Sequence, residues 1–314
     1  MVSDRPLYGL LLMLGFCIVA PAADAVAKLL GQTMPIGQLV FFRFAIQAVL
    51  LIPLVWVTAR PWRMRGRVLR LTLLRTVMHV FGIGLMVAAL QYLPLADAIA
   101  ICFVMPFLLL VLGRLLLKEE VGRRRILAAL AGFSGTLLVI QPSFTEVGWA
   151  ALLPLGVALN FAFFILVTRQ IAKETDPVGL QAVSGVFAVG LIGPALLLGP
   201  VLPLESLALI SPNGTEWMLL LGIGLLGTLA HLLMTWSLRF APAATLAPLQ
   251  YLEIPVAAMI GLAVFGDWPD ALALMGILVT VAAGLYVAIT EKSTAAPAGR
   301  RAPAPPSQTA QPAE

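Results

Sequence analysis

Seven polar or ionisable residues interrupt long apolar stretches of the sequence. They are Asp24, Lys28, Arg43, Gln47, His79, Asn160 and Glu253. A charged side chain at the centre of a membrane costs about 2.5–3.5 kcal/mol on insertion scales, so such groups should face a protein interior or water. Together these side chains offer hydrogen-bond donors and acceptors of both charges. We therefore expect them to bind a small polar substrate.

Two pairs among these residues share a spacing. Asp24 and Lys28 are four residues apart, and Arg43 and Gln47 repeat that spacing in the next apolar stretch. Residues four apart lie on the same face of a helix. The pairs could form a polar rim that contacts the substrate, or Asp24 and Lys28 could form a structural salt bridge. The sequence leaves both interpretations open.

The other three residues fall near the middle of their apolar stretches. Glu253 lies two residues before Pro255, and a proline inside a helix removes a hydrogen bond and kinks the helix. Helix breaks near the middle of the membrane mark transport sites. We expect Glu253 to be the proton-coupling group, with a structural hydrogen bond as the alternative. Asn160 could equally join helices, and His231 is expected to be structural.

The composition indicates the elements that must position these residues. The 314-residue chain is 61% hydrophobic and 11% charged, against roughly 25% charged in soluble domains. Its apolar stretches are about 20 residues long, the length with which a helix crosses a bilayer. We predict an all-α membrane protein with ten transmembrane helices. The expected spans are 8–29, 36–57, 71–91, 95–117, 126–141, 148–169, 178–198, 217–238, 243–265 and 271–290.

The basic residues alternate between the loops of this arrangement. Every even-numbered loop carries lysine or arginine, as in the run Arg123–Arg125, and every odd-numbered loop has neither. Loops rich in these residues stay in the cytoplasm. We expect a multi-pass protein of a bacterial inner membrane with both termini in the cytoplasm. Of the 20 basic residues, all but Lys28 and Arg43 should lie at the cytoplasmic side or reach it by snorkelling.

The two halves of the chain resemble each other. Residues 90–96 match residues 238–244, and Pro106 matches Pro255. Five spans are an odd number, so the second half must enter the membrane inverted, as in many secondary transporters. We predict two inverted five-helix repeats, residues 1–145 and 146–291. Residues 292–314, rich in alanine and proline, should form a disordered cytoplasmic tail.

This combination resembles a known family. Ten spans in two repeats, Pro106 and Pro255, and the acidic residues Glu119 and Asp267 are similar to the EamA branch of the drug/metabolite transporter superfamily. The segment 24–43 is also similar to bacterial riboflavin and S-adenosylmethionine importers. The resemblance implies a secondary transporter for a small polar metabolite, with riboflavin import favoured. The alternatives are amino-acid or metabolite export and S-adenosylmethionine import.

An enzyme is the alternative from another class. Gly132-Phe133-Ser134-Gly135 has the pattern of intramembrane serine proteases, and His231 would be its partner. That interpretation explains neither the repeat nor the ten spans, so we expect no enzyme. We also expect no catalytic residue, metal ion or cofactor. The expected partners are the substrate, the lipid bilayer and a coupled proton but no nucleic acid, and a homodimer is left open.

Overall fold

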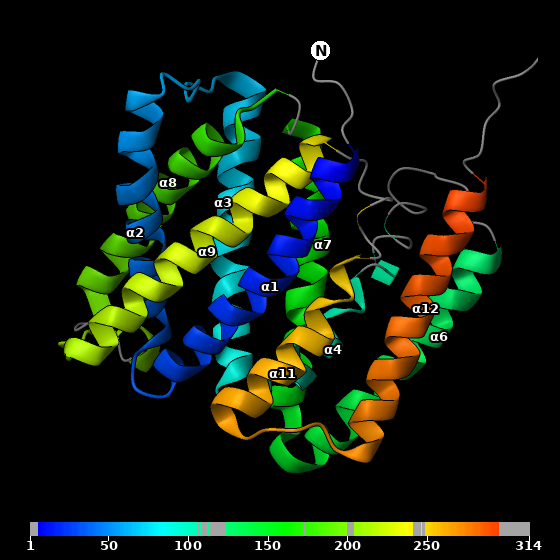
Figure 1. Cartoon of the computed structure of the whole chain (residues 1–314). Coiled ribbons are helices and arrows are strands. Elements are labelled where there is room, and N and C mark those ends of the chain that lie inside the picture. Colours follow the sequence, from blue (N-terminus) through cyan, green and yellow to red (C-terminus); the bar gives the residue numbers. More distant parts are fainter. Residues whose placement is uncertain are drawn as a thin grey trace, which may run out of the picture.

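Every regular element described in the computed structural model is a helix (Figure 1). The structure describes residues 6–105, 107–108, 112, 123–171, 174–199, 204–240, 246 and 249–294. Lipid offers no hydrogen bonds to the backbone, and a helix satisfies its own backbone groups internally. The all-α class predicted from the sequence is therefore observed throughout the described part of the chain.

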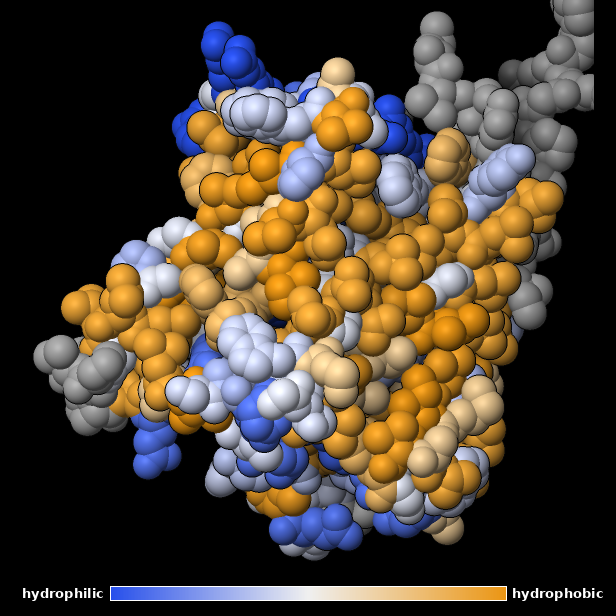
Figure 2. Space-filling view, turned by 60° about the vertical axis from the view of Figure 1, so that its left-hand side comes forward, coloured by the Kyte–Doolittle hydropathy of each residue, from blue (hydrophilic) through white to orange (hydrophobic). Residues whose placement is uncertain are grey.

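The described helices are as follows. They are α1 (Pro6–Gly31), α2 (Ile36–Val57), α3 (Gly66–Leu90), α4 (Leu95–Cys102), α6 (Arg123–Val147), α7 (Leu153–Ile171), α8 (Pro177–Leu198), α9 (Gly214–Phe240), α11 (Glu253–Phe265) and α12 (Ala271–Thr294). Two short 3₁₀ helices, η1 (Gly148–Leu152) and η3 (Glu205–Leu207), complete them. Figure 2 shows a broad apolar band with polar residues toward both ends, as a membrane-embedded surface requires.

Six helical segments are long and apolar enough to cross a membrane. They are Leu7–Gly31, Ile36–Val57, Gly66–Leu90, Ser143–Thr168, Pro177–Leu198 and Gly214–Phe240. Three shorter apolar helices, Leu130–Ile140, Glu253–Phe265 and Ala271–Ala283, lie where further spans were predicted. Because parts of the predicted fourth and ninth spans, with Pro106 and Glu119, lie outside the described residues, the count of ten stays a prediction. Helix α12 extends to Thr294, past the predicted start of the tail, and residues 295–314 also lie outside that description.

The helices pack mainly in pairs that are distant in the sequence. Helix α1 packs along α9, α3 along α7, and α2 along α8. Helix α4 contacts α11, and α6 lies beside α12 (Figure 1). Each of these pairs joins a helix of residues 1–145 to a helix of residues 146–291, so the two halves of the chain interlock.

Ion pairs gather three of the predicted cytoplasmic loops at one end of the bundle. Arg60, after α2, lies 3.1 Å from Asp176, which caps the N-terminus of α8. Arg239, at the end of α9, lies 3.9 Å from the same carboxylate. Arg67 pairs with Glu174 at 3.0 Å. These loops share one end, as the charge pattern predicted, while the side of the membrane that this end faces stays a prediction.

Small residues allow α6 and α12 to approach closely. A Cβ atom on Gly135 would lie 2.5 Å from the hydroxyl oxygen of Thr280 and 2.7 Å from the carbonyl oxygen of Gly276. The hydroxyl of Thr280 donates to the carbonyl of Gly132 at 3.4 Å, across the same contact. Gly132 is also buried, and a Cβ atom there would meet the ring of Phe107, so both glycines of the suspected protease pattern serve close packing.

We expect Gly135→Ala to destabilise the protein by about 1–3 kcal/mol, because the added methyl group meets backbone atoms that cannot move aside. The measurement is the melting temperature of the purified protein in detergent. Gly84→Ala is the matched control, since a Cβ atom at Gly84 in α3 meets nothing within 4 Å. Equal melting temperatures for the two variants would contradict the close contact between α6 and α12.

Candidate functional site

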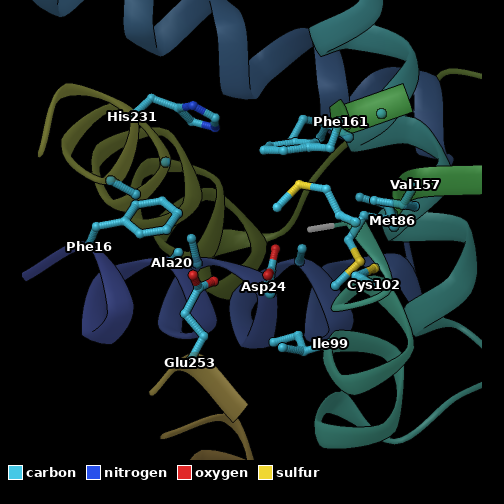
Figure 3. Close-up of a pocket in the computed structure, with 18 of the residues that line it drawn as sticks. Phe16, Ala20, Asp24, Met86, Ile99, Cys102, Val157, Phe161, His231 and Glu253 are labelled. Atoms are coloured by element: carbon cyan, nitrogen blue, oxygen red, sulfur yellow. The ribbon is translucent and has the colours of Figure 1, made fainter. Parts of the chain in front are cut away.

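A cavity lies among seven helices and the two segments that follow α4 and precede α11 (Figure 3). It encloses about 1030 Å³ of empty space, including the space at its open side. Its walls are mostly apolar and include the rings of Phe16 and Phe161, the thioether of Met86 and the thiol of Cys102.

Three of the predicted site residues line this cavity: Asp24 from α1, Arg43 from α2 and Glu253 from α11. In Figure 3 the carboxyl groups of Asp24 and Glu253 point toward the same part of the cavity, with His231 on the opposite side. Among the described residues, Arg43 is the only arginine or lysine in the lining. The cavity thus combines an apolar interior with two carboxyl groups, one guanidinium and one imidazole.

Arg43 is buried in the cavity wall. Its side chain is 4% exposed, and its guanidinium lies 5.1 Å from the centre of the Phe44 ring. A Cβ atom on Gly227 of α9 would lie 2.8 Å from Nε and 2.9 Å from Nη2 of Arg43, so the guanidinium packs directly against this glycine. Its Nη1 has no hydrogen-bond partner among the described residues.

Two histidines form a buried pair next to the cavity. The Nε2 atoms of His79 in α3 and His231 in α9 are 2.9 Å apart, and the rings of Phe44 and Phe164 flank His79. His231 lines the cavity and His79 lies behind it. Sequence reasoning treated His231 as structural and so missed its place in the wall. The available signal was that the chain has only two histidines, both within apolar stretches.

Helix ends meet at the cavity. Helix α4 ends at Cys102 and α11 begins at Glu253, and the rings of Phe103 and Tyr251 between these ends lie 5.0 Å apart. Pro255 lies in the first turn of α11, where proline is tolerated, and the helix break expected beside it falls at Tyr251 and Leu252, directly before Glu253. The N-terminus of a helix carries partial positive charge, which favours a carboxylate at Glu253.

Lys28 pairs with a residue other than the one that its spacing suggested. Its Nζ atom lies 2.6 Å from Oδ2 of Asp267 and 4.5 Å from the centre of the Phe265 ring. The salt bridge between Asp24 and Lys28 considered from the sequence is not formed. The flexible lysine side chain reaches the turn between α11 and α12 instead, which ties α1 to the second half of the chain. Lys28 is not among the residues that line the cavity.

The remaining predicted site residues, Gln47 and Asn160, join helices. Gln47 Nε2 donates to the carbonyl oxygen of Gln181 in α8 at 2.8 Å. Asn160 Nδ2 donates to the carbonyl oxygen of Met78 in α3 at 2.9 Å. Neither residue belongs to the cavity lining, and both contacts are of the kind that holds membrane helices together.

Arg75 is a buried arginine that sequence reasoning placed at the cytoplasmic side. Its side chain is fully buried, donates to the hydroxyls of Thr168 at 3.0 Å and Ser184 at 3.2 Å, and lies 4.5 Å from the centre of the Phe164 ring. Because its guanidinium is bound inside the bundle, Arg75 does not reach the surface by snorkelling, as had been expected of it. Arg75 lies one helical turn before His79, a spacing that could have revealed it.

The protease pattern does not assemble a site. The side chain of Ser134 is exposed on α6, and its hydroxyl donates to the carbonyl of Leu130 in its own helix at 2.9 Å. The Nε2 atom of His231 is paired with His79 instead. Within the described residues there is also no cluster of three or more His, Cys, Asp or Glu side chains that could hold a metal ion.

The partner of Lys28 can be tested by exchanging charges. We expect Lys28→Asp with Asp267→Lys to recover most of the melting temperature that either single substitution loses, because the exchange restores the ion pair. The exchange of Lys28 with Asp24 should recover little. Melting temperatures of the three single and two double variants in detergent check this, and recovery only with Asp24 would contradict the observed pairing.

Comparison with solved structures and with characterised proteins agrees with this architecture. One crystal structure superposes with a TM-score of 0.65 over 93% of this chain and 100% of its own, at 16% sequence identity, which shows a shared fold. A riboflavin transporter of Vibrio cholerae is 28% identical over 292 residues, covering 91% of this chain and 94% of that protein. A riboflavin transporter of Rhizobium johnstonii is 30% identical over 232 residues, covering 73% and 71% of the two chains.

A different substrate appears in the name of a third relative. An S-adenosylmethionine uptake transporter of Rickettsia felis is 23% identical over 282 residues, covering 88% of this chain and 90% of that protein. The sequence profile of the EamA-like transporter family matches residues 7–141 and, again, residues 148–289. Together these matches span nearly the whole chain. The protein is a membrane transporter that belongs to the EamA-like transporter family.

Proposed function

We propose that this protein is a secondary transporter that imports riboflavin across a bacterial inner membrane, with both termini in the cytoplasm. The observation that carries the proposal is the cavity among seven helices, where α4 ends and α11 begins. Broken helices near the middle of the membrane are typical of substrate sites in secondary transporters. Relatives that cover most of the chain and are named riboflavin transporters support the choice of substrate.

The helix pairing supports two inverted repeats. If residues 1–145 and 146–291 are equivalent, α1 corresponds to α7, α2 to α8, α3 to α9, and α6 to α12. Exchanging the halves then turns the α1–α9 pair into the α7–α3 pair and leaves the α2–α8 and α6–α12 pairs as pairs of equivalents. A pseudo-twofold axis in the membrane plane produces this relation. Such an axis would let the halves rock and expose the cavity alternately to either side.

Glu253 is our candidate for proton coupling. It begins α11 and faces the cavity together with Asp24, and no hydrogen bond ties either carboxyl group to another described residue. A carboxyl group in this position can load a proton from one side of the membrane and release it to the other. The homodimer left open by the sequence stays a prediction.

S-adenosylmethionine uptake is the second candidate. The two carboxyl groups in the cavity would suit the cationic centre of S-adenosylmethionine. The matches to relatives named S-adenosylmethionine uptake transporters cover up to 91% of those proteins. The charge of the substrate therefore separates the two candidates.

Growth of auxotrophic bacteria tests the substrate. Expression of this chain in a riboflavin-requiring strain without its own transporter should restore growth at riboflavin concentrations that leave the parent strain starved. Uptake of labelled riboflavin, S-adenosylmethionine and a set of amino acids by the same cells provides the comparison. Uptake of S-adenosylmethionine without riboflavin would favour the second candidate, and outward movement of an amino acid would favour export.

The coupling role of Glu253 predicts a separation of two activities. Glu253→Gln imitates the protonated form, so accumulation against a gradient should fall to background while exchange of labelled for unlabelled riboflavin continues, because exchange needs no net proton movement. Proteoliposomes with and without an imposed pH gradient measure both. Wild-type uptake that ignores the gradient, or a variant that still concentrates riboflavin, would remove the coupling role.

A further inference from the structure

An open recess lies beside the loop that joins α2 to α3, at the upper end of the bundle in Figure 1. It is lined by Val55, Trp56, Ala59, Arg60, Trp62 and Arg63. None of these residues lines the substrate cavity, so the recess is a separate feature of the surface. Two indole rings and two guanidinium groups surround it. The recess therefore offers both apolar ring surface and positive charge to a ligand.

The turn after α2 shapes the recess. The backbone amide of Arg60 donates to the carbonyl of Val55 at 3.1 Å, and the amide of Ala59 donates to the carbonyl of Trp56 at 3.3 Å. These two bonds form a Schellman turn, in which Ala59 takes the left-handed conformation at a φ of 48°. The side chain of Arg60 then pairs with Asp176 at the start of α8. These contacts turn the chain back beside α2, and the recess lies between the loop and the last turn of that helix.

Arg63 brings an uncompensated positive charge to this recess. Its side chain is exposed, and its guanidinium lies 5.6 Å from the centre of the Trp62 ring. Among the described residues no ion pair includes Arg63, whereas Arg60 is paired with Asp176 at 3.1 Å. The loop 58–65 contains three arginines and no acidic residue. An anionic group is the ligand that complements this charge.

The recess continues into an exposed apolar stripe on α2. Trp56 is 76% exposed, and Ile52 and Val49, four and seven residues before it, are exposed as well. Residues at this spacing lie on one face of a helix. Helix α2 is long and apolar enough to cross a membrane, and tryptophan at the end of such a helix belongs to the membrane–water interface. A ligand that matches both the recess and the stripe has an anionic head and hydrocarbon chains.

We propose that this recess binds the headgroup of an anionic phospholipid. Arg63 donates hydrogen bonds to the phosphate, Arg60 adds positive charge beside it, and the acyl chains lie along the stripe that ends at Trp56. Arginine suits this role because its planar group presents several donors to a phosphate at once. Basic pockets at the ends of membrane helices bind lipid headgroups in this way. An acidic protein partner would match the charge but would leave the apolar stripe without a role.

Lipid binding by the purified, delipidated full chain in detergent tests the proposal. The probes are phosphatidylglycerol and phosphatidylcholine with identical acyl chains, and native mass spectrometry counts the lipids bound to each protein molecule. We expect phosphatidylglycerol to bind at least about tenfold more tightly, because the two guanidinium groups repel the positive choline group. An excess of inorganic phosphate should leave the lipid bound, since phosphate has no chains to contact α2.

Two exposed arginines give a matched pair of variants. Arg63→Gln should weaken phosphatidylglycerol binding about tenfold, as loss of charge-assisted hydrogen bonds does, and should change phosphatidylcholine binding less. Arg70→Gln is the control, because it removes one exposed arginine from the early part of α3 outside the recess. It should bind both lipids as the wild type does. Neither side chain is buried, so both variants should melt at the wild-type temperature before lipid is added.

Three results would overturn the inference. The first is equal binding of the two lipids by the wild type. The second is phosphatidylglycerol binding that falls no further in Arg63→Gln than in Arg70→Gln, which would indicate diffuse attraction to a basic surface. The third is displacement of the lipid by inorganic phosphate, which would indicate a site for small anions. None of these measurements uses a transported substrate, so they decide this inference independently of the proposed function.

Discussion

The absence of water in the hydrocarbon region is the constraint on which this structure depends. Every backbone group there must find its partner within the protein, so the described chain is helical, and irregular backbone is tolerated only where it borders a cavity. The end of α4 at Cys102 and the start of α11 at Glu253 meet that condition, because both residues line the cavity. The interruption of these helices places the carboxyl group of Glu253 and the ring of Phe103 in the wall of the cavity. The fold and the site thus follow from one requirement.

The same constraint explains how the two halves of the chain hold together. Helices in lipid gain little from burying apolar surface against one another, so close packing and polar contacts provide the specificity. The polar contacts here join opposite halves: His79 with His231, Gln47 with Gln181, and Asn160 with Met78. Arg75 makes the same connection through the hydroxyls of Thr168 and Ser184. Because these contacts join the two halves, the rocking motion that we propose would change the distances across them.

Residues that sequence reasoning selected for one role turn out to divide into two groups. Asp24, Arg43 and Glu253 line the cavity, whereas Lys28, His79, Gln47 and Asn160 contact other parts of the protein. Sequence analysis selected the residues of both groups for the same reason, because each is a polar side chain in an apolar stretch. The penalty for burying such a group is the same whether its partner is a substrate or another helix, so polarity alone cannot distinguish them. His231 and Arg75 were missed because the first was assigned to packing and the second was assumed to reach the membrane surface.

The sequence by itself determined the helical class, the transporter family and the choice of apolar stretches that hold polar residues. The helical class and the apolar stretches depend on composition and on spacing within one helix, which can be read along a single chain. The family was indicated by a resemblance that extends over both halves of the sequence. The tertiary structure alone decided which partner each polar residue takes. Lys28 illustrates the difference: its spacing pointed to Asp24, four residues away, yet its ammonium group contacts Asp267, which is 239 residues distant. A contact between helices depends on how two helix surfaces pack in space. The spacing of residues within one helix does not indicate which residues of another helix it will contact.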